Sequence, residues 1–100
     1  MIVYQVDLQV DAAIADAYLP WLRAHVRQML ALPGFEQATL LAVIDPPPPA
    51  DAVQWCVQYR LRDQAALDDY LRNHAAAMRA EGLQRFGAAV RASRRVLQPV

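Results

Sequence analysis

The chain has only one cysteine, three glycines, no lysine and no net charge, and these shortages exclude several classes of protein. The single cysteine, Cys56, allows neither an internal disulfide nor a cysteine-based metal cluster, and we expect its thiol to be inert. Zero net charge removes the basic surface of a protein that binds nucleic acid or an anionic membrane, so we predict neither partner. No apolar run approaches the roughly 20 residues of a membrane span. Because no leader precedes the first predicted strand, we expect a cytoplasmic protein.

A length of 100 residues suits one domain, residues 1–100. A domain of this size has a limited core, and burying more surface against a second copy would stabilise it, so we expect a homodimer. No glycine-rich phosphate loop, nucleophile elbow or metal-ligand spacing occurs in the sequence. We therefore predict no cofactor and no metal.

Two segments, residues 2–10 and 53–61, alternate apolar and polar side chains as half-buried strands do. The apolar rows are Ile2, Tyr4, Val6, Leu8 and Val10 in the first segment, and Val53, Trp55, Val57, Tyr59 and Leu61 in the second. The opposite rows are rich in glutamine and contain Gln5, Asp7, Gln9, Gln54, Cys56, Gln58 and Arg60. One face of the sheet should pack on helices, while the other is wet or lines a polar cavity.

A first helix should begin at Asp11, as its N-cap, and run to about residue 31. Pro20 should kink it or restart it, because proline lacks the amide that would bond to the carbonyl of Asp16. Residues 35–45 should form a strand with apolar residues on both sides, with Phe35 and Leu41 sharing one side. Such a strand is usually buried on both sides.

The four prolines at 46–49 predict a stiff, exposed loop of polyproline conformation. Asp63 should cap a second helix, for which Gly82 suits one C-terminus and Gly87 a final stop. Residues 89–98 should form the last strand.

The resulting order is strand, helix, strand, strand, helix, strand, which predicts an α+β fold of the ferredoxin-like βαββαβ type. Its four-stranded antiparallel sheet would have strands one and three at the centre and both helices on one face. Gln5, Asp7, Gln58 and Arg60 would then lie in the middle of the open face. Two such sheets packed face to face would enclose a polar cavity.

Residues along nearly the whole chain resemble those of a small bacterial family, known only as a domain of unknown function, within the dimeric α+β barrel superfamily. They are Tyr4, Val6, Trp21, His25, Met29, Leu30, Leu32, Pro33, Gly34, Phe35, Tyr59, Tyr70, Leu71, His74, Ala75, Met78, Arg79, Arg85, Phe86, Ser93, Arg94 and Arg95. The resemblance implies two ferredoxin-like subunits whose sheets close into one barrel. It implies no activity, because the family has none assigned.

The wider superfamily includes cofactor-free quinone-forming monooxygenases, haem-degrading monooxygenases, decarboxylases, isomerases and simple binding proteins, and the fold does not choose among them. One haem-degrading subgroup has an asparagine on strand one, a tryptophan on strand three and a histidine on helix two. This chain is similar in having Asp7, Trp55 and His74 in those elements, so His74 is a candidate catalytic residue and haem degradation a minor alternative. However, Asp7 lacks an amide, and the alternation places Trp55 on the opposite face.

Asp7 is the other candidate catalytic residue, because burial in a cavity would raise the pKa of its carboxyl group and make it a general base. Gln5, Gln58 and Arg60 are candidate ligand-binding residues on the same face. Arg60, or Arg94 or Arg95 of the last strand, could pair with Asp7 or hold an anionic substrate through two parallel hydrogen bonds. The alternative is that Asp7 and Arg60 form a structural ion pair in the dimer interface.

Other polar residues have simpler structural interpretations. His25 lies on an apolar helix stripe, where histidine is more often a hydrogen-bonded core residue than a proton carrier. Arg91, Arg94 and Arg95 fit a charged edge strand that discourages further strand pairing.

From these patterns we expect binding, or cofactor-independent conversion, of a small polar or aromatic metabolite in a cavity of the homodimer. The alternative is a non-enzymatic structural or regulatory dimerisation domain.

Overall fold

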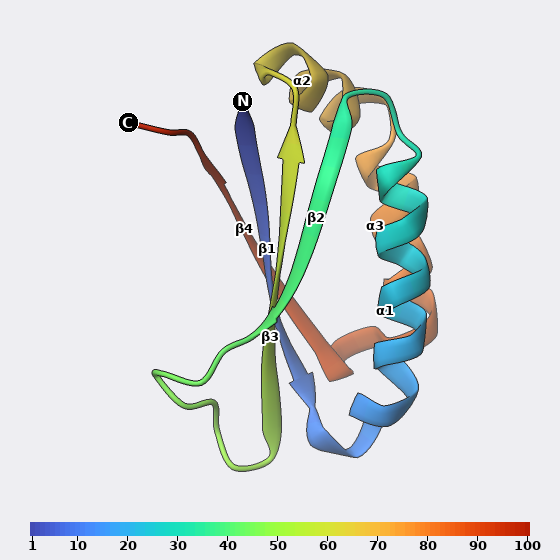
Figure 1. Ribbon diagram of the computed structural model, residues 1–100. Helices are drawn as coiled ribbons and strands as arrows, with labels where there is room; N and C mark the ends of the chain where they lie inside the picture. The colour runs from blue at the N-terminus through green and yellow to red at the C-terminus, as the bar shows by residue number, and fades with distance from the viewer.

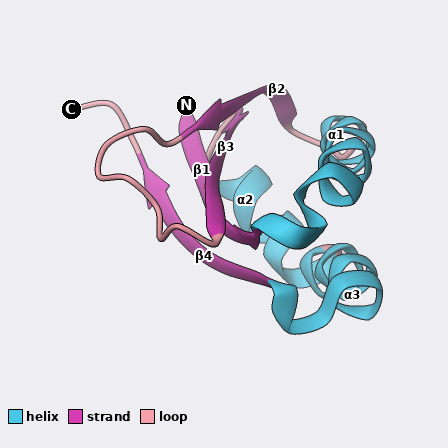
Figure 2. Ribbon diagram, turned by 90° about the horizontal axis from the view of Figure 1, so that it is seen from below, coloured by secondary structure: helices cyan, strands magenta, loops and turns pink.

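The computed structural model describes residues 1–100 and contains one antiparallel sheet with the strand order β2-β3-β1-β4. The strands are β1 (Ile2–Asp11), β2 (Phe35–Ala42), β3 (Ala52–Leu61) and β4 (Val90–Leu97). The helices are α1 (Ala15–Leu30), α2 (Gln64–Asn73) and α3 (Ala75–Phe86). All three lie on one face of the sheet, with α2 at one end and α1 and α3 side by side along it (Figures 1 and 2). The predicted ferredoxin-like α+β fold, with strands one and three central, is confirmed.

The register of β1 against β3 aligns the two polar rows that the sequence showed. Tyr4 lies opposite Tyr59, and Gln5 lies opposite Gln58. Since directly opposed residues share a face of the sheet, the two tyrosines point towards the helices and the two glutamines away from them. Both tyrosines are buried in the core, so the predicted orientation of the central strands is confirmed.

A β-bulge between Phe35 and Gln37 resets the alternation of β2, and the predicted grouping of its side chains was wrong. Phe35 lies opposite Leu61 and faces the helices, whereas Leu41 lies opposite Cys56 and faces outward. Leu41 is 43% exposed, so β2 is not buried on both sides within the chain. The physical reason is that one extra residue in the strand moves every later side chain to the other face.

The first helix differs from the prediction at both its start, Asp11, and its predicted kink, Pro20. Asp11 makes no capping hydrogen bond; its Oδ1 accepts one from Arg91 Nη2 at 3.0 Å, and a 3-10 turn at Ala12–Ile14 precedes α1. The helix also runs from Ala15 to Leu30 without a restart at Pro20. Pro20 lies only five residues into the helix and on its exposed side, so only one early hydrogen bond is lost.

The second predicted helix is divided at His74 into α2 and α3, and Gly82 lies inside α3 rather than at an end. The division has no sequence signal, because neither proline nor glycine is present at this point. The other signals are confirmed: Asp63 Oδ1 accepts a hydrogen bond from the Ala66 amide at 2.9 Å, and Gly87 follows the last helical residue. The division allows α3 to turn and run beside α1 (Figure 1).

The prolines at 46–49 lie in the loop between β2 and β3, which projects beyond the sheet on the side away from the helices (Figure 1). Three of these four prolines are exposed, as predicted. None of the helices is both long enough and apolar enough to cross a membrane.

Gly34 is the residue of the turn into β2 that we expect to tolerate substitution least. Its φ is +82°, and an added Cβ would collide with Ala66. Gly34→Ala should lower the free energy of unfolding by roughly 3 kcal/mol, from backbone strain and overpacking together. Gly87→Ala is the matched control, because Gly87 has φ +55° and ψ −135° but open space around it, and backbone strain alone should cost about 1–3 kcal/mol. Urea unfolding measures both values, and an equal or smaller effect at Gly34 would contradict the packing described.

Candidate functional site

The outer face of the sheet brings together three of the five residues predicted to form the site. Gln58 Nε2 donates to Gln5 Oε1 at 3.1 Å, and Gln5 Nε2 donates to Asp7 Oδ2 at 3.2 Å. Gln5 is only 5% exposed. This row is therefore an ordered hydrogen-bonded network whose members already satisfy one another.

The other two predicted site residues lie elsewhere. Arg60 Nε is 3.8 Å from Glu36 Oε1, so within one chain Arg60 pairs with Glu36 and not with Asp7. Arg60 lies opposite Val3, and Asp7 is four residues further along β1, about 13 Å away at the usual strand rise. His74 lies at the α2–α3 junction, on the helix side of the sheet, with its Nε2 3.8 Å from Asp69 Oδ2.

The set proposed for haem chemistry is separated in the same way. Asp7 lies on the outer face, whereas Trp55 stacks on Tyr18 on the helix side with ring centroids 6.3 Å apart. A shallow polar hollow does lie beside Asp7, bordered by the four prolines, Ser93 and Arg95. Burial, with the nearby Asp7, raises the pKa of the Cys56 thiol in this hollow to about 11, so the thiol stays protonated at neutral pH.

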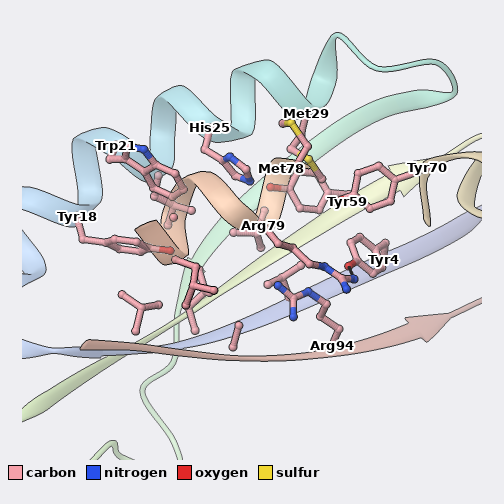
Figure 3. Close-up of a pocket in the computed structure, with 18 of the residues that line it drawn as sticks. Tyr4, Tyr18, Trp21, His25, Met29, Tyr59, Tyr70, Met78, Arg79 and Arg94 are labelled. Atoms are coloured by element: carbon pink, nitrogen blue, oxygen red, sulfur yellow. Dashed lines mark hydrogen bonds between the residues drawn. The ribbon is translucent and has the colours of Figure 1, made fainter. Parts of the chain in front are cut away.

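A second, apolar cavity lies on the other face of the sheet, beneath α1 and α3 (Figure 3). Its volume is about 310 Å³, within the range of small-molecule sites, and 14 of its 19 lining residues are hydrophobic. Ala75 is the only buried residue of α3, and Met78 and Phe86 of this helix are partly buried against the core. The aliphatic part of its lining consists of Val6, Leu8, Leu22, Met29, Val57, Met78, Leu83, Val90 and Ala92.

Two aromatic groups stand at the two ends of this inner cavity. We call the first the tyrosine cluster, with neighbouring ring centroids 5.2–6.2 Å apart; it consists of Tyr4, Phe35, Tyr59 and Tyr70. We call the second the tryptophan cluster, with neighbouring centroids 4.9–6.3 Å apart; it consists of Tyr18, Trp21, Trp55 and Phe86. Figure 3 shows Tyr18 and Trp21 at one end and Tyr4, Tyr59 and Tyr70 at the other. A flat apolar ligand would meet aromatic rings at either end.

His25 points from α1 into the inner cavity (Figure 3) and stacks on Trp21, with centroids 4.8 Å apart and an interplanar angle of 14°. Its Nδ1 is buried and has no hydrogen-bond partner in the chain. Burial lowers the pKa of His25, and the opposing charge of Glu81 on α3 is the smaller influence, so the imidazole is neutral at pH 7. A neutral imidazole has one N–H group and one nitrogen with a free lone pair, and the latter nitrogen can accept a proton.

Arg79 of α3 and Arg94 of β4 supply the only charged groups that line the inner cavity. Arg79 Nη2 donates to the Tyr4 hydroxyl at 2.9 Å. Arg94 has no hydrogen-bonded or ionic partner in the chain, and its charge acts on both Tyr18 and Tyr70. No carboxylate lines the cavity to balance the two guanidinium groups.

The tyrosine hydroxyls of the inner cavity remain protonated. Burial raises the pKa of Tyr18 and of Tyr70 to about 12, and raises that of Tyr59 still further. Only the Tyr4 hydroxyl has a hydrogen-bond partner in the chain. The other three are therefore free to donate hydrogen bonds to a ligand.

The sequence patterns favoured a core role for His25, and they placed Arg94 on a charged edge or beside Asp7 as a clamp for an anionic substrate, so neither was assigned to the inner cavity. The alternation of the last strand did contain a signal. Val90, Ala92 and Arg94 lie on the same face of this strand. Their partners on β1 are Val10, Leu8 and Val6, which belong to the core or pack against it. An arginine on an otherwise apolar row points to a polar group that faces the interior.

The comparisons place the whole chain in one family. The model of a domain of unknown function, DUF4286, matches residues 1–100. The chain belongs to the DUF4286 family. No curated protein matches this DUF4286 chain.

Solved structures similar to this DUF4286 chain share its ferredoxin-like α+β fold. An antibiotic biosynthesis monooxygenase has a TM-score of 0.68 and 17% identity, with 100% of this chain and 99% of that chain covered. An ethyl tert-butyl ether d (ethd) family protein from Bacillus halodurans has a TM-score of 0.70 and 14% identity, with 100% of both chains covered. SnoaB from Streptomyces nogalater, a cofactor-independent oxygenase, has a TM-score of 0.60 and 18% identity, with 99% of this chain and 93% of that chain covered. At these identities the likeness shows the fold alone.

The lowered pKa of His25 predicts a pH dependence of stability. Between the ordinary histidine value of 6.5 and the lower value in the folded chain, the unfolded state binds more protons. Stability should therefore fall as the pH falls through this interval, and His25→Gln should remove that part of the fall. Urea unfolding at pH 7.5 and 5.5 tests this. An equal pH effect in the variant and the wild-type chain would show that His25 is not held neutral by burial.

Proposed function

We propose that this DUF4286 chain binds a small aromatic molecule in the inner cavity and removes a proton from it without a cofactor, with His25 as the base. The observation that carries the proposal is the His25 imidazole, which is neutral, makes no hydrogen bond at its Nδ1 and lines a cavity walled by aromatic rings.

Stacking would position the substrate ring. Trp21 holds the His25 imidazole nearly parallel to its own ring, and the tyrosine cluster closes the far end of the cavity. A flat ligand between the clusters would have few orientations available. Its acidic hydrogen would therefore meet the base in the same geometry each time the ligand binds.

Charge would stabilise the product of proton removal. When His25 takes the proton, it becomes an imidazolium ion and the substrate becomes an enolate or phenolate. The tyrosine hydroxyls inside the cavity are donors for that oxygen anion, and the positive charges of Arg79 and Arg94 at its mouth stabilise the anion further. The cofactor-independent oxygenase activity named for SnoaB is compatible with a site of this kind.

A second proposal concerns the outer face, for which the notable observation is the nearly complete burial of Gln5 within a single chain. We propose that two copies pack sheet to sheet, with the Gln5, Asp7 and Gln58 row at the interface. Leu41 and Leu97 are exposed on the two edge strands, at 43% and 37%, and would flank that row with apolar contacts. In this arrangement the row acts as an interface network, and the catalytic role predicted for Asp7 is unnecessary.

Exchange of an acidic C–H tests the base directly. The probe is 2-tetralone in D2O, whose hydrogens next to the carbonyl are replaced by deuterium when a base removes them. The wild-type chain should accelerate this exchange above the buffer rate, and His25→Gln should reduce the acceleration by about 100-fold, the usual contribution of a general base. Proton NMR measures the loss of signal.

Asp7→Asn and His74→Gln are the matched controls, because these two residues were the catalytic candidates from sequence and lie outside the inner cavity. Both variants should retain the wild-type exchange rate. Full activity in His25→Gln, or its loss in either control, would refute the assignment of the base.

The oligomeric proposal has its own test. Native mass spectrometry should show a dimer for the wild-type chain and a monomer for a Leu41→Arg, Leu97→Arg variant, because charges on both edges would be buried without partners. Gln84→Arg, on the exposed side of α3, is the control and should remain dimeric. A monomeric wild-type chain would contradict the sheet-to-sheet interface.

A further inference from the structure

We propose that the ligand of the inner cavity is an aryl carboxylate whose carboxylate group is bound by Arg79 and Arg94 and whose ring lies between the two aromatic clusters. This inference rests on the proposed function and names the substrate class of the same site.

The first argument is the balance of donors and acceptors around the cavity. Arg79, Arg94, Tyr18, Tyr59 and Tyr70 present donors that the chain does not fully use. The neutral His25 offers one acceptor nitrogen. A ligand that accepts hydrogen bonds from these donors must contain several oxygen acceptors. It needs no more than one acidic hydrogen, which His25 would accept.

The second argument is electrostatic. Figure 3 shows the side chains of Arg79 and Arg94 together beside Tyr4, and both charges lower the pKa of the Tyr70 hydroxyl, against the larger effect of burial. Glu81 acts on His25 but does not line the cavity. Two neighbouring positive charges beside apolar walls are unfavourable until an anion lies between them. A planar carboxylate suits the forked guanidinium group, which can donate two parallel hydrogen bonds to it.

The third argument is position. Both arginines are exposed residues, whereas the aromatic rings of Tyr18, Tyr59 and Tyr70 are buried. Arg94 is on the edge strand β4, and Leu83 of α3, another lining residue, is 69% exposed. The charged groups therefore lie at the mouth of the cavity, and the apolar rings lie inside. A ligand with a flat apolar body and one charged end would enter with its ring first.

A matched pair of probes tests this class. 2-Naphthoate and 2-naphthamide have nearly the same shape and differ in charge, and isothermal titration calorimetry gives the Kd of each. The wild-type chain should bind the carboxylate at least about tenfold more tightly than the amide, the usual size of a hydrogen bond to a charged group. Arg94→Gln should remove this preference and leave amide binding unchanged. Arg94 makes no contact that the fold requires, so the variant should fold.

Arg91→Gln is the control on the same strand, because Arg91 lies on the opposite face and pairs with Asp11. It should keep the preference for the carboxylate. Arg79→Gln should weaken the preference as Arg94→Gln does, and circular dichroism would show whether loss of its bond to Tyr4 disturbs the fold.

The outcomes separate this inference from the proposed function. If both probes bind equally well to the wild-type chain, the cavity stands as an aromatic site and the carboxylate class is wrong. Tighter binding of 2-naphthyl phosphate than of 2-naphthoate would also overturn the carboxylate class, in favour of a phosphate ester. If neither probe binds and 2-tetralone exchange is absent as well, the proposed function itself fails.

Discussion

The aromatic rings at the two ends of the helix layer are the constraint on which the rest of the structure depends. The tyrosine cluster and the tryptophan cluster both fill the space between helices and sheet with large side chains, while the stretch between them is walled by smaller ones such as Val6, Val57 and Ala92. Rings of this size hold the helices at a distance that the smaller side chains cannot bridge. The inner cavity is the consequence. Gly82 contributes to the same geometry, because a Cβ there would lie 2.9 Å from the Trp21 ring and would force the two helices apart.

The chemistry of the inner cavity follows from this packing. Burial between the clusters keeps His25 neutral and keeps the tyrosine hydroxyls protonated. The same burial leaves Nδ1 of His25 without a partner, and the lack of a carboxylate leaves Arg94 without one. The buried donors and the charge of Arg94 at the mouth of the cavity together suit a flat, oxygen-bearing anion. The outer face presents the reverse case, since Gln5, Gln58 and Asp7 satisfy one another.

Sequence patterns predicted the sheet well because apolar and polar residues alternate regularly along the central strands. This alternation is visible in the local sequence, and the contacts between helices and sheet agree with it. The strand order and the inward direction of Tyr4 and Tyr59 follow from it. Two features were beyond local patterns. The bulge after Phe35 inserts one residue and carries no glycine or proline, so the faces of β2 were assigned wrongly. The division at His74 is equally unmarked, yet it directs α3 alongside α1 and so creates the cavity wall.

The candidate site was harder to predict than the fold because its residues look like core and edge residues when they are taken one at a time. His25 and Arg94 gain meaning only when α1 and β4 are placed around a common space. The polar row of the central strands attracted attention because it is contiguous in sequence, and its members Gln5, Gln58 and Asp7 do meet, on the opposite face of the sheet from the inner cavity.

The most direct test of this account is to locate a bound aromatic molecule by NMR, because the two faces of the sheet carry different reporters. Titration of 15N-labelled protein with 2-naphthoate should shift the indole N–H of Trp21 and the amides around Arg94, and should leave the side-chain amides of Gln5 and Gln58 in place. Shifts confined to those two glutamines would place the ligand on the outer face and contradict the central claim.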